Sequence, residues 1–200
     1  MPRVGILALQ GDFAAHSRVL TALQVEWHLV KTPDALAQVD GLIIPGGEST
    51  TLLKLLATSG IRPALEHFHA QHRPIFGTCA GLIVLAQETI QPHQESLGFI
   101  DLVAARNAYG RQIDSFMALG TLLDMATFGV VPLEMVFIRA PKIVQVGTAV
   151  TPLATCREEI VLARQGNVLV STFHPELTSD RRVHQYFLQM LADACRDIGP

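Results

Sequence analysis

The segment Ile75-Phe76-Gly77-Thr78-Cys79-Ala80-Gly81-Leu82 is typical of a strand that turns sharply into a helix. Gly77 and Gly81 stand two residues before and two residues after Cys79, the spacing of a nucleophile elbow with cysteine in place of serine. In so tight a turn, a Cβ at either glycine would collide with neighbouring backbone. The turn predicts that Cys79 lies at the carboxyl edge of a sheet and at a helix N-terminus, where the helix dipole favours thiolate over thiol. A buried structural cysteine is the alternative interpretation of this segment.

Around this turn, apolar runs that are rich in β-branched residues alternate with helical patterns. We expect strands over residues 3–9, 26–30, 41–44 and 74–76, and helices over 12–23, 63–71 and from 82 to 86. Ser49 or Thr50 is expected to cap a further helix that contains residues 52–56. The repeated strand–helix–strand order predicts a three-layer α/β fold, with a mostly parallel sheet flanked by helices.

The second half of the chain has a different pattern, in which strands are joined by turns. We expect strands over residues 113–119, 134–138, 144–150, 159–164 and 168–172, with a hairpin turn at Gln165-Gly166-Asn167. A helix over residues 180–197 closes the chain. These segments predict antiparallel additions to the parallel sheet. Repeats, low-complexity stretches and linkers are absent from the sequence, so we expect a single domain over residues 1–200.

Composition narrows the class of protein. Hydrophobic residues make up 49% and charged residues 16% of the 200 residues, which indicates a large buried core. The formal net charge of −3 and the lack of a basic run argue against a nucleic-acid partner. Without a signal-peptide layout or a membrane-length apolar run, the predicted location is the cytoplasm. The three cysteines, Cys79, Cys156 and Cys195, are far apart, which argues against a disulfide scaffold and a zinc site.

A cysteine nucleophile usually needs a histidine base and a third group that orients the histidine. His174 follows an apolar strand pattern within Phe173-His174-Pro175-Glu176, and we expect His174 and Glu176 to project the same way from an extended segment. His67, His69 and His72 fit a solvated helix face better than a metal cluster. The remaining histidines stand isolated in the sequence: His16, His28, His93 and His184. A strand-end histidine with a surface glutamate remains the alternative for His174 and Glu176.

A glycine pair precedes the elbow in Pro45-Gly46-Gly47-Glu48-Ser49-Thr50, between an expected strand and an expected helix. Adjacent glycines allow the backbone to turn an N–H toward a developing oxyanion. The backbone N–H of Ala80 is a second candidate donor. A plain strand–helix turn is the alternative, and a phosphate cradle is disfavoured because the P-loop lysine pattern is absent.

Together these motifs resemble the class I, triad-type glutamine amidotransferases, and within them the glutaminase subunits of pyridoxal 5′-phosphate synthase. The blocks that carry the resemblance run nearly from end to end: residues 5–11, 46–50, 76–82, 106–112, 137–141 and 173–178. The chain departs from the family mainly over residues 119–131, which are more apolar than expected and contain no catalytic motif.

The resemblance implies hydrolysis of L-glutamine to L-glutamate and ammonia without a metal or organic cofactor. It implies a catalytic triad of Cys79, His174 and Glu176. It implies an oxyanion hole at Gly47 and Ala80. It implies glutamine binding by Gly47, Glu48, Ser49, Arg106, Ile138 and Arg139.

The resemblance also implies a partner, a (β/α)₈-barrel synthase subunit that receives the ammonia, with Gln10 at the contact. Arg106 or Arg139 suits the substrate carboxylate and Glu48 its ammonium group, whereas surface charge is the alternative for the arginines. Two other functions stay open from the sequence: a cysteine peptidase of the same fold, and a non-catalytic assembly subunit.

Overall fold

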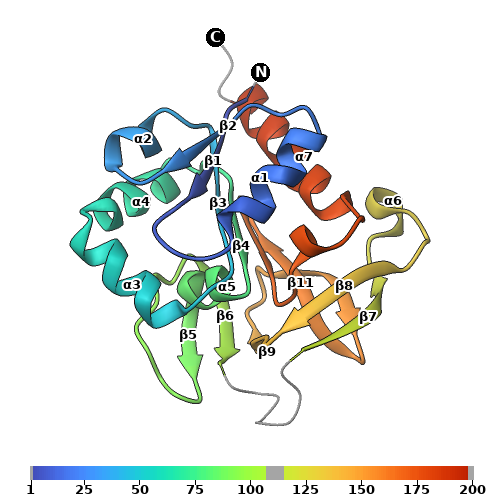
Figure 1. The fold of residues 1–200 in the computed structure, drawn as a ribbon. Helices are drawn as coiled ribbons and strands as arrows, with labels where there is room; N and C mark the ends of the chain where they lie inside the picture. The colour runs from blue at the N-terminus through green and yellow to red at the C-terminus, as the bar shows by residue number, and fades with distance from the viewer. Residues whose placement is uncertain (1, 107–114, 198–200) are drawn as a thin grey trace.

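In the computed structural model, which describes residues 2–106 and 115–197, the alternating first part of the chain contributes four strands of a parallel sheet, and the second part contributes a fifth (Figure 1). Its strands are β1 (Val4–Leu7), β2 (Trp27–Val30), β3 (Gly41–Ile44), β4 (Ile75–Thr78) and β12 (Val168–Ser171). They lie in the order β2-β1-β3-β4-β12, and each pairs with its neighbours in parallel. Every residue of β1, β3, β4 and β12 is buried, as expected for strands that are covered on both faces.

Antiparallel strands extend the sheet beyond β12. They are β11 (Glu159–Gln165), β10 (Thr151–Cys156), β7 (Ser115–Leu122) and β8 (Leu133–Ile138), in that spatial order. Gln165 pairs with Val168, so Gly166 and Asn167 form the turn between β11 and β12. The predicted α/β class, the antiparallel additions and this hairpin are thereby confirmed.

A small second sheet contains β5 (Ala86–Ile90), β6 (Ile100–Ala105) and β9 (Lys142–Val146). The expected helix over residues 82–86 is wrong at its ends, because α5 (Ala80–Leu85) begins earlier and Ala86 is already extended and pairs with Ile100. The strand expected over residues 144–150 begins and ends earlier, as β9. Strands β5, β6 and β10 were not expected from the sequence. The first two residues of the strand expected over 113–119 lie outside the described residues.

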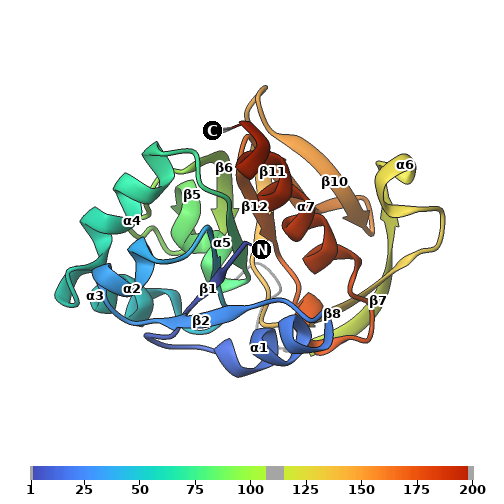
Figure 2. The same cartoon turned by 90° about the horizontal axis from the view of Figure 1, so that it is seen from above.

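Two sets of helices cover the two faces of the main sheet (Figure 2). One face packs against α2 (Pro33–Ala37), α3 (Ser49–Thr58), α4 (Ile61–Ala70) and α5. The other face packs against α1 (Phe13–Ala22), α7 (Arg182–Asp197) and the short α6 (Met125–Phe128). Adjacent strand residues serve opposite cores, since Ile43 belongs to the second and Ile44 to the first. No helix in residues 2–106 and 115–197 has the length and apolarity to cross a membrane.

The N-terminus of α3 corrects one prediction. Neither Ser49 nor Thr50 is its cap, because Glu48 is the N-cap residue. The Glu48 carboxylate accepts hydrogen bonds from the backbone N–H groups of Thr50, at 3.1 Å, and Thr51, at 2.7 Å. A glutamate side chain is long enough to fold back over the first turn and satisfy both donors.

Candidate active site

Cys79 occupies a strained turn between β4 and α5. Its φ is +50° and its ψ is −102°, an unfavourable backbone conformation for a residue with a Cβ. A Cβ on Gly77 would lie 2.7 Å from the carbonyl carbon of Gly81, and a Cβ on Gly81 would overlap the carbonyl oxygen of Ile44. The predicted need for both glycines is confirmed. The turn is held by its surroundings, since the Cys79 N–H donates to the Ser171 carbonyl at 2.9 Å.

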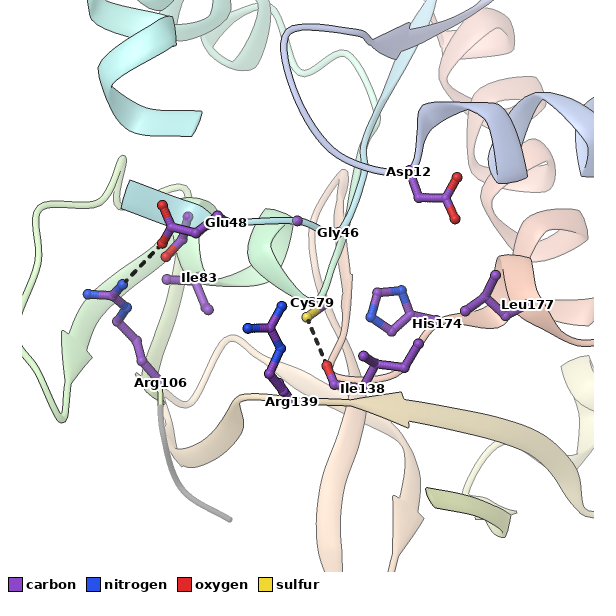
Figure 3. Close-up of a pocket in the computed structure, with 12 residues that line it drawn as sticks. Asp12, Gly46, Glu48, Cys79, Ile83, Arg106, Ile138, Arg139, His174 and Leu177 are labelled. Atoms are coloured by element: carbon purple, nitrogen blue, oxygen red, sulfur yellow. Dashed lines mark hydrogen bonds and ion pairs between the residues drawn. The ribbon is translucent and has the colours of Figure 1, made fainter. Parts of the chain in front are cut away.

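The loops after β3, β4 and β12 meet at one edge of the sheet and bring Gly46, Cys79 and His174 together (Figure 3). A Cβ on Gly46 would overlap Cε1 of His174 and would lie 3.3 Å from Cβ of Cys79. Gly46 is therefore packed against both side chains, and the first glycine of the pair makes room for the imidazole beside the thiol. The Sγ of Cys79 lies 4.0 Å from the carbonyl oxygen of Ile138 on the opposite wall.

His174 is held by a carboxylate two residues away. Its Nδ1 lies 2.7 Å from Oε1 of Glu176, and both side chains are buried. The expected extended segment is wrong, because residues Pro175–Leu177 form a 3₁₀ helix. Proline is tolerated at the first position of a helix, and the turn that follows swings the Glu176 carboxylate back to the ring. The His174 N–H donates to the Val136 carbonyl at 2.8 Å and anchors the segment to β8.

The charges at this edge reinforce one another. Burial lowers the pKa of His174, but hydrogen bonds to Cys79 and Glu176 outweigh burial and raise that pKa to about 10. Burial raises the pKa of Glu176, but the neighbouring His16 and His174 outweigh burial and lower it to about 2. His174 therefore favours its imidazolium form and Glu176 its carboxylate form at neutral pH. An imidazolium next to a cysteine is the arrangement that stabilises a thiolate.

These residues open onto a pocket with a volume of about 290 Å³. Its lining includes all six residues predicted to bind glutamine: Gly47, Glu48, Ser49, Arg106, Ile138 and Arg139. Cys79 and His174 also line it, whereas Glu176 lies behind His174. The volume is at the lower end of the roughly 300–1,000 Å³ typical of ligand sites, so the pocket suits a small ligand. Because Glu48, Arg106 and Arg139 line it, the pocket also suits a ligand with charges of both signs.

Comparison with known proteins agrees with this geometry. The profile of the SNO glutamine amidotransferase family matches residues 6–193. The chain belongs to this glutamine amidotransferase family. It is 51% identical to the pyridoxal 5′-phosphate synthase subunit PdxT of Pseudothermotoga lettingae, over 94% of both chains. It is 46% identical to the subunit of that name from Carboxydothermus hydrogenoformans, over 94% of this chain and 96% of the relative.

Solved structures of other proteins share the fold of this amidotransferase. A crystal structure described as a glutamine amidotransferase superposes with a TM-score of 0.87 at 42% identity, covering 94% of this chain and 98% of the other. PurLQS from Thermotoga maritima shares the fold, with a TM-score of 0.71 at 17% identity, over 95% of this chain and 99% of that one. The predicted fold class and the resemblance to glutamine amidotransferases are confirmed.

Within the amidotransferase pocket, Glu48 and Arg106 are already partnered. Arg106 Nη2 lies 3.7 Å from Glu48 Oε1 and donates to Thr50 Oγ1 at 2.9 Å. Burial raises the pKa of Glu48, but hydrogen bonds from Thr51 and Thr50 outweigh burial and lower it to about 2. The Glu48 carboxylate therefore stays ionised while it caps α3. Arg139 reaches the pocket from a backbone with a φ of +44°, which is unfavourable for a residue with a side chain.

The glycine loop of the amidotransferase is tied to the N-terminal segment. The Glu48 N–H donates to Oε1 of Gln10 at 3.0 Å, and a Cβ on Gly47 would overlap the Gln10 amide. The Asp12 N–H donates to the Gly46 carbonyl at 3.1 Å. Gln10, predicted to contact a partner, thus also contacts the loop that carries Gly47.

The structure adds residues that the sequence did not single out. Asp12, Ile83 and Leu177 also line the pocket, and Gln94 accepts hydrogen bonds from Ser49 and Thr50 at 3.2 and 3.1 Å. Asp12 follows β1 at the same sheet edge, a signal that would have found it. His16 lies 3.6 Å from Glu176, and no local sequence signal indicates this contact. The family block continues from Arg106 into residues 107–112, which lie outside the described residues.

Proposed function

We propose that this amidotransferase hydrolyses the side-chain amide of L-glutamine with Cys79 as nucleophile, His174 as acid and base, and Glu176 as the group that orients His174. The observation that carries the proposal is that two segments far apart in the sequence lie together in the structure. The strained turn with Cys79 and the His174–Glu176 pair, 2.7 Å apart, meet beside one pocket. Because Cys79 comes from the first half of the chain and His174 from the second, we also propose that residues 1–200 act as a single domain.

The first half of the reaction forms a thioester. The Cys79 thiolate attacks the side-chain amide carbon of glutamine, and the C=O electron pair moves onto oxygen. The Ala80 N–H, at the first position of α5, has no partner within that helix. Together with the Gly47 N–H it would hold the oxyanion. As the C–N bond breaks, the His174 imidazolium gives its proton to the leaving nitrogen, and ammonia departs.

The second half releases glutamate. Neutral His174 takes a proton from water, the resulting hydroxide attacks the thioester carbon, and the C–S bond breaks to regenerate the Cys79 thiolate. Glu176 accepts the Nδ1–H of His174 throughout, which leaves Nε2 to exchange protons. The sum is one glutamine and one water converted to one glutamate, one ammonia and one proton.

The charges of the pocket match the two ends of a free amino acid. Arg139 and Arg106 suit the α-carboxylate, and Glu48 suits the α-ammonium. Gly47, Ser49 and Ile138 complete the wall around the substrate. A peptide substrate lacks these two free charges, so the pocket favours glutamine over a polypeptide.

The ammonia passes to a synthase subunit in a hetero-oligomer that makes pyridoxal 5′-phosphate. Support comes from the relatives named above, which are subunits of pyridoxal 5′-phosphate synthase and match along nearly their whole length. The partner is a (β/α)₈ barrel by the resemblance of the sequence motifs. Gln10 suits the contact, because it links the N-terminal segment to the Gly47 loop. The cytoplasm remains the predicted location.

The test is glutamate release from glutamine, measured with and without the synthase subunit. We expect release that rises when the synthase is added, together with glutamine-dependent formation of pyridoxal 5′-phosphate. A casein-cleavage assay in parallel should stay at background. Peptide cleavage without glutamate release would replace the proposed function with a peptidase activity.

A further inference from the structure

A buried polar chain extends behind Glu176, away from the pocket. His16 on α1 is fully buried, and its Nε2 lies 3.6 Å from Glu176 Oε1 and 3.3 Å from Thr78 Oγ1. Its Nδ1 lies 3.0 Å from Nε2 of His184 on α7, which is also fully buried. One imidazole thus faces both the end of the nucleophile strand and the carboxylate that holds the base.

The protonation states of His16 and His184 follow from their burial and their hydrogen-bond partners. Burial lowers the pKa of His16, and burial lowers the pKa of His184 to about 3. Both rings are therefore neutral at physiological pH, with one N–H each. Nδ1 of His184 has no hydrogen-bond partner among the described residues. An unpaired acceptor is cheaper to bury than an unpaired donor, so His184 carries its proton on Nε2.

This assignment fixes the orientation of His16. The Nε2–H of His184 donates to Nδ1 of His16, and the remaining proton of His16 must sit on Nε2. That N–H points at Thr78 Oγ1 and presents its dipole to the Glu176 carboxylate. The charged or titratable groups that face His16 are Glu176 and His174 beyond β12, Asp12 at the start of α1, and His184 on α7.

The Glu176 carboxylate needs such a support. Its Oε1 holds His174, but its Oε2 is buried without a hydrogen-bond partner among the described residues. A carboxylate anchored by one oxygen can rotate, and rotation would misalign the His174 ring. His16 packs behind this carboxylate, with its Nε2 3.6 Å from the same Oε1.

We propose that His16 is a positioning residue for the glutaminase reaction, which sets Glu176 relative to the Cys79 turn, and that His184 holds His16 in the orientation this requires. The inference rests on the proposed triad. It extends the catalytic machinery to α1 and α7, on a face of the sheet that substrate does not reach.

The test compares four variants in the complex with the synthase subunit. His16→Leu should lower kcat about tenfold, the lower end of what groups behind a reacting residue contribute, and leave KM within about twofold. His16→Gln places an amide N–H near the position of Nε2 and should regain most of kcat, whereas His16→Asn, which reaches only the position of Nδ1, should not. Val19→Ala is the matched control, since Val19 is buried on the same helix and carries no polar atom.

A double-mutant cycle distinguishes a positioning role of His16 from a merely structural one. In a Glu176→Gln background, His16→Leu should cause little further loss of kcat, because the carboxylate that His16 positions is already absent. The rate of Cys79 alkylation by iodoacetamide at neutral pH, read by mass spectrometry of the Cys79 peptide, gives a second measure. The rate should fall in His16→Leu, since a misaligned Glu176 stabilises the His174 imidazolium less, and should not change in Val19→Ala.

The outcomes separate this inference from the proposed triad. If Glu176→Gln keeps full activity, the triad is wrong and the role of His16 is wrong with it. If Glu176→Gln is impaired while His16→Leu keeps its kcat, or if the two losses multiply in the cycle, only the role of His16 is overturned. Should His16→Leu fail to fold, equal kcat values for His16→Gln and His16→Asn overturn the proposal.

Discussion

Glu176 separates two regions that have opposite electrostatic character although they share one carboxylate. On the pocket side, His174 accepts a proton readily, because hydrogen bonds to Cys79 and Glu176 outweigh burial and raise its pKa to about 10. On the buried side, the balance is reversed: burial lowers the pKa of His16, and it lowers that of His184 to about 3. The difference lies in burial and in partners, because His16 and His184 are fully buried, whereas His174 has a hydrogen bond to Cys79. His174 Nδ1 also lies 2.7 Å from Glu176 Oε1, against 3.6 Å for His16 Nε2. A direct hydrogen bond to an anion offsets desolvation, whereas a longer contact does not.

Charge is thereby confined to the side where the reaction takes place. In the proposed reaction, the pocket side exchanges protons with glutamine, and in the proposed arrangement behind it the neutral rings of His16 and His184 position the Glu176 carboxylate. Each prediction below changes one side and asks whether the other responds.

The largest effect is expected from the nucleophile on the pocket side. Cys79→Ala should lower glutamate release by about 10⁴-fold or more, because the covalent route is lost. Synthesis of pyridoxal 5′-phosphate from added ammonia should persist in the complex. Cys195→Ala is the control, since Cys195 is exposed and does not line the pocket. Glutamine-dependent synthesis that survives in Cys79→Ala would show that the chain acts as an assembly subunit.

The shared carboxylate comes next. Glu176→Gln should lower kcat by about 10³-fold, somewhat less than the roughly 10⁴-fold loss for the equivalent change in a serine protease, and should leave KM nearly unchanged. The amide can no longer balance an imidazolium, so the pKa of His174, followed by NMR of the ring, should fall. A His174 pKa that stays high in Glu176→Gln would assign the stabilisation to Cys79 alone.

The substrate-facing charges should have smaller effects that appear in KM. Arg139→Met and Arg106→Met should each raise KM for glutamine about 10- to 100-fold, the equivalent of one charge-assisted hydrogen bond. The effect of Arg106 includes the loss of its contacts with Thr50 and Glu48. Arg18→Met, on the surface of α1, is the control. A fall in kcat with unchanged KM would place the arginine at the reacting amide instead of the carboxylate.

The smallest effects concern stability, and their signs differ between the two sides. The folded state holds the His174 proton up to about pH 10, whereas an unfolded histidine releases it near pH 6.5. Stability from His174 is therefore present below pH 6.5 and lost as pH rises toward 10, by up to about 1.4 kcal/mol per pH unit for one proton.

His184 acts in the opposite direction, since its ring stays neutral in the fold down to about pH 3. The unfolded state binds the extra proton below pH 6.5, so stability falls as pH drops. Urea unfolding from pH 5 to 9.5 should show an alkaline decline that flattens in His174→Gln and an acid decline that flattens in His184→Asn. If both variants flatten the same limb, the contrast between the two sides is wrong.

The parallel half of the fold could be predicted because its signal is local. Strand β3 has the predicted bounds, Gly41–Ile44, since a short apolar run between turn residues is buried on both faces. Strands β5 and β6 were missed because their burial does not alternate cleanly, and because β6 is placed by pairing with β5 and with the distant β9. Strand β10 contains Pro152, which argues against a strand by local rules.

The same distinction applies to the site. The Cys79 turn and the His174–Glu176 pair each lie within a few residues, so their spacing indicates the chemistry. The roles of Glu48 as a helix cap and of His16 behind Glu176 depend on how α3 and α1 pack, and local sequence carries no record of that packing. The structure of the apolar residues 119–131 also depends on a distant contact. Arg182 on α7 donates to the Phe128, Val131 and Pro132 carbonyls, and the local sequence does not indicate this contact.

The central claim, that Cys79 is the nucleophile that glutamine approaches, is tested most directly by affinity labelling of the complex. A chloromethyl ketone analogue of glutamine presents an electrophilic carbon near the position of the amide and alkylates the group that attacks there. We predict one label per chain, on the Cys79 peptide, with loss of glutamate release in proportion and protection by glutamine. Labelling of another residue in step with loss of activity, or labelling of Cys79 that glutamine does not slow, would contradict the account.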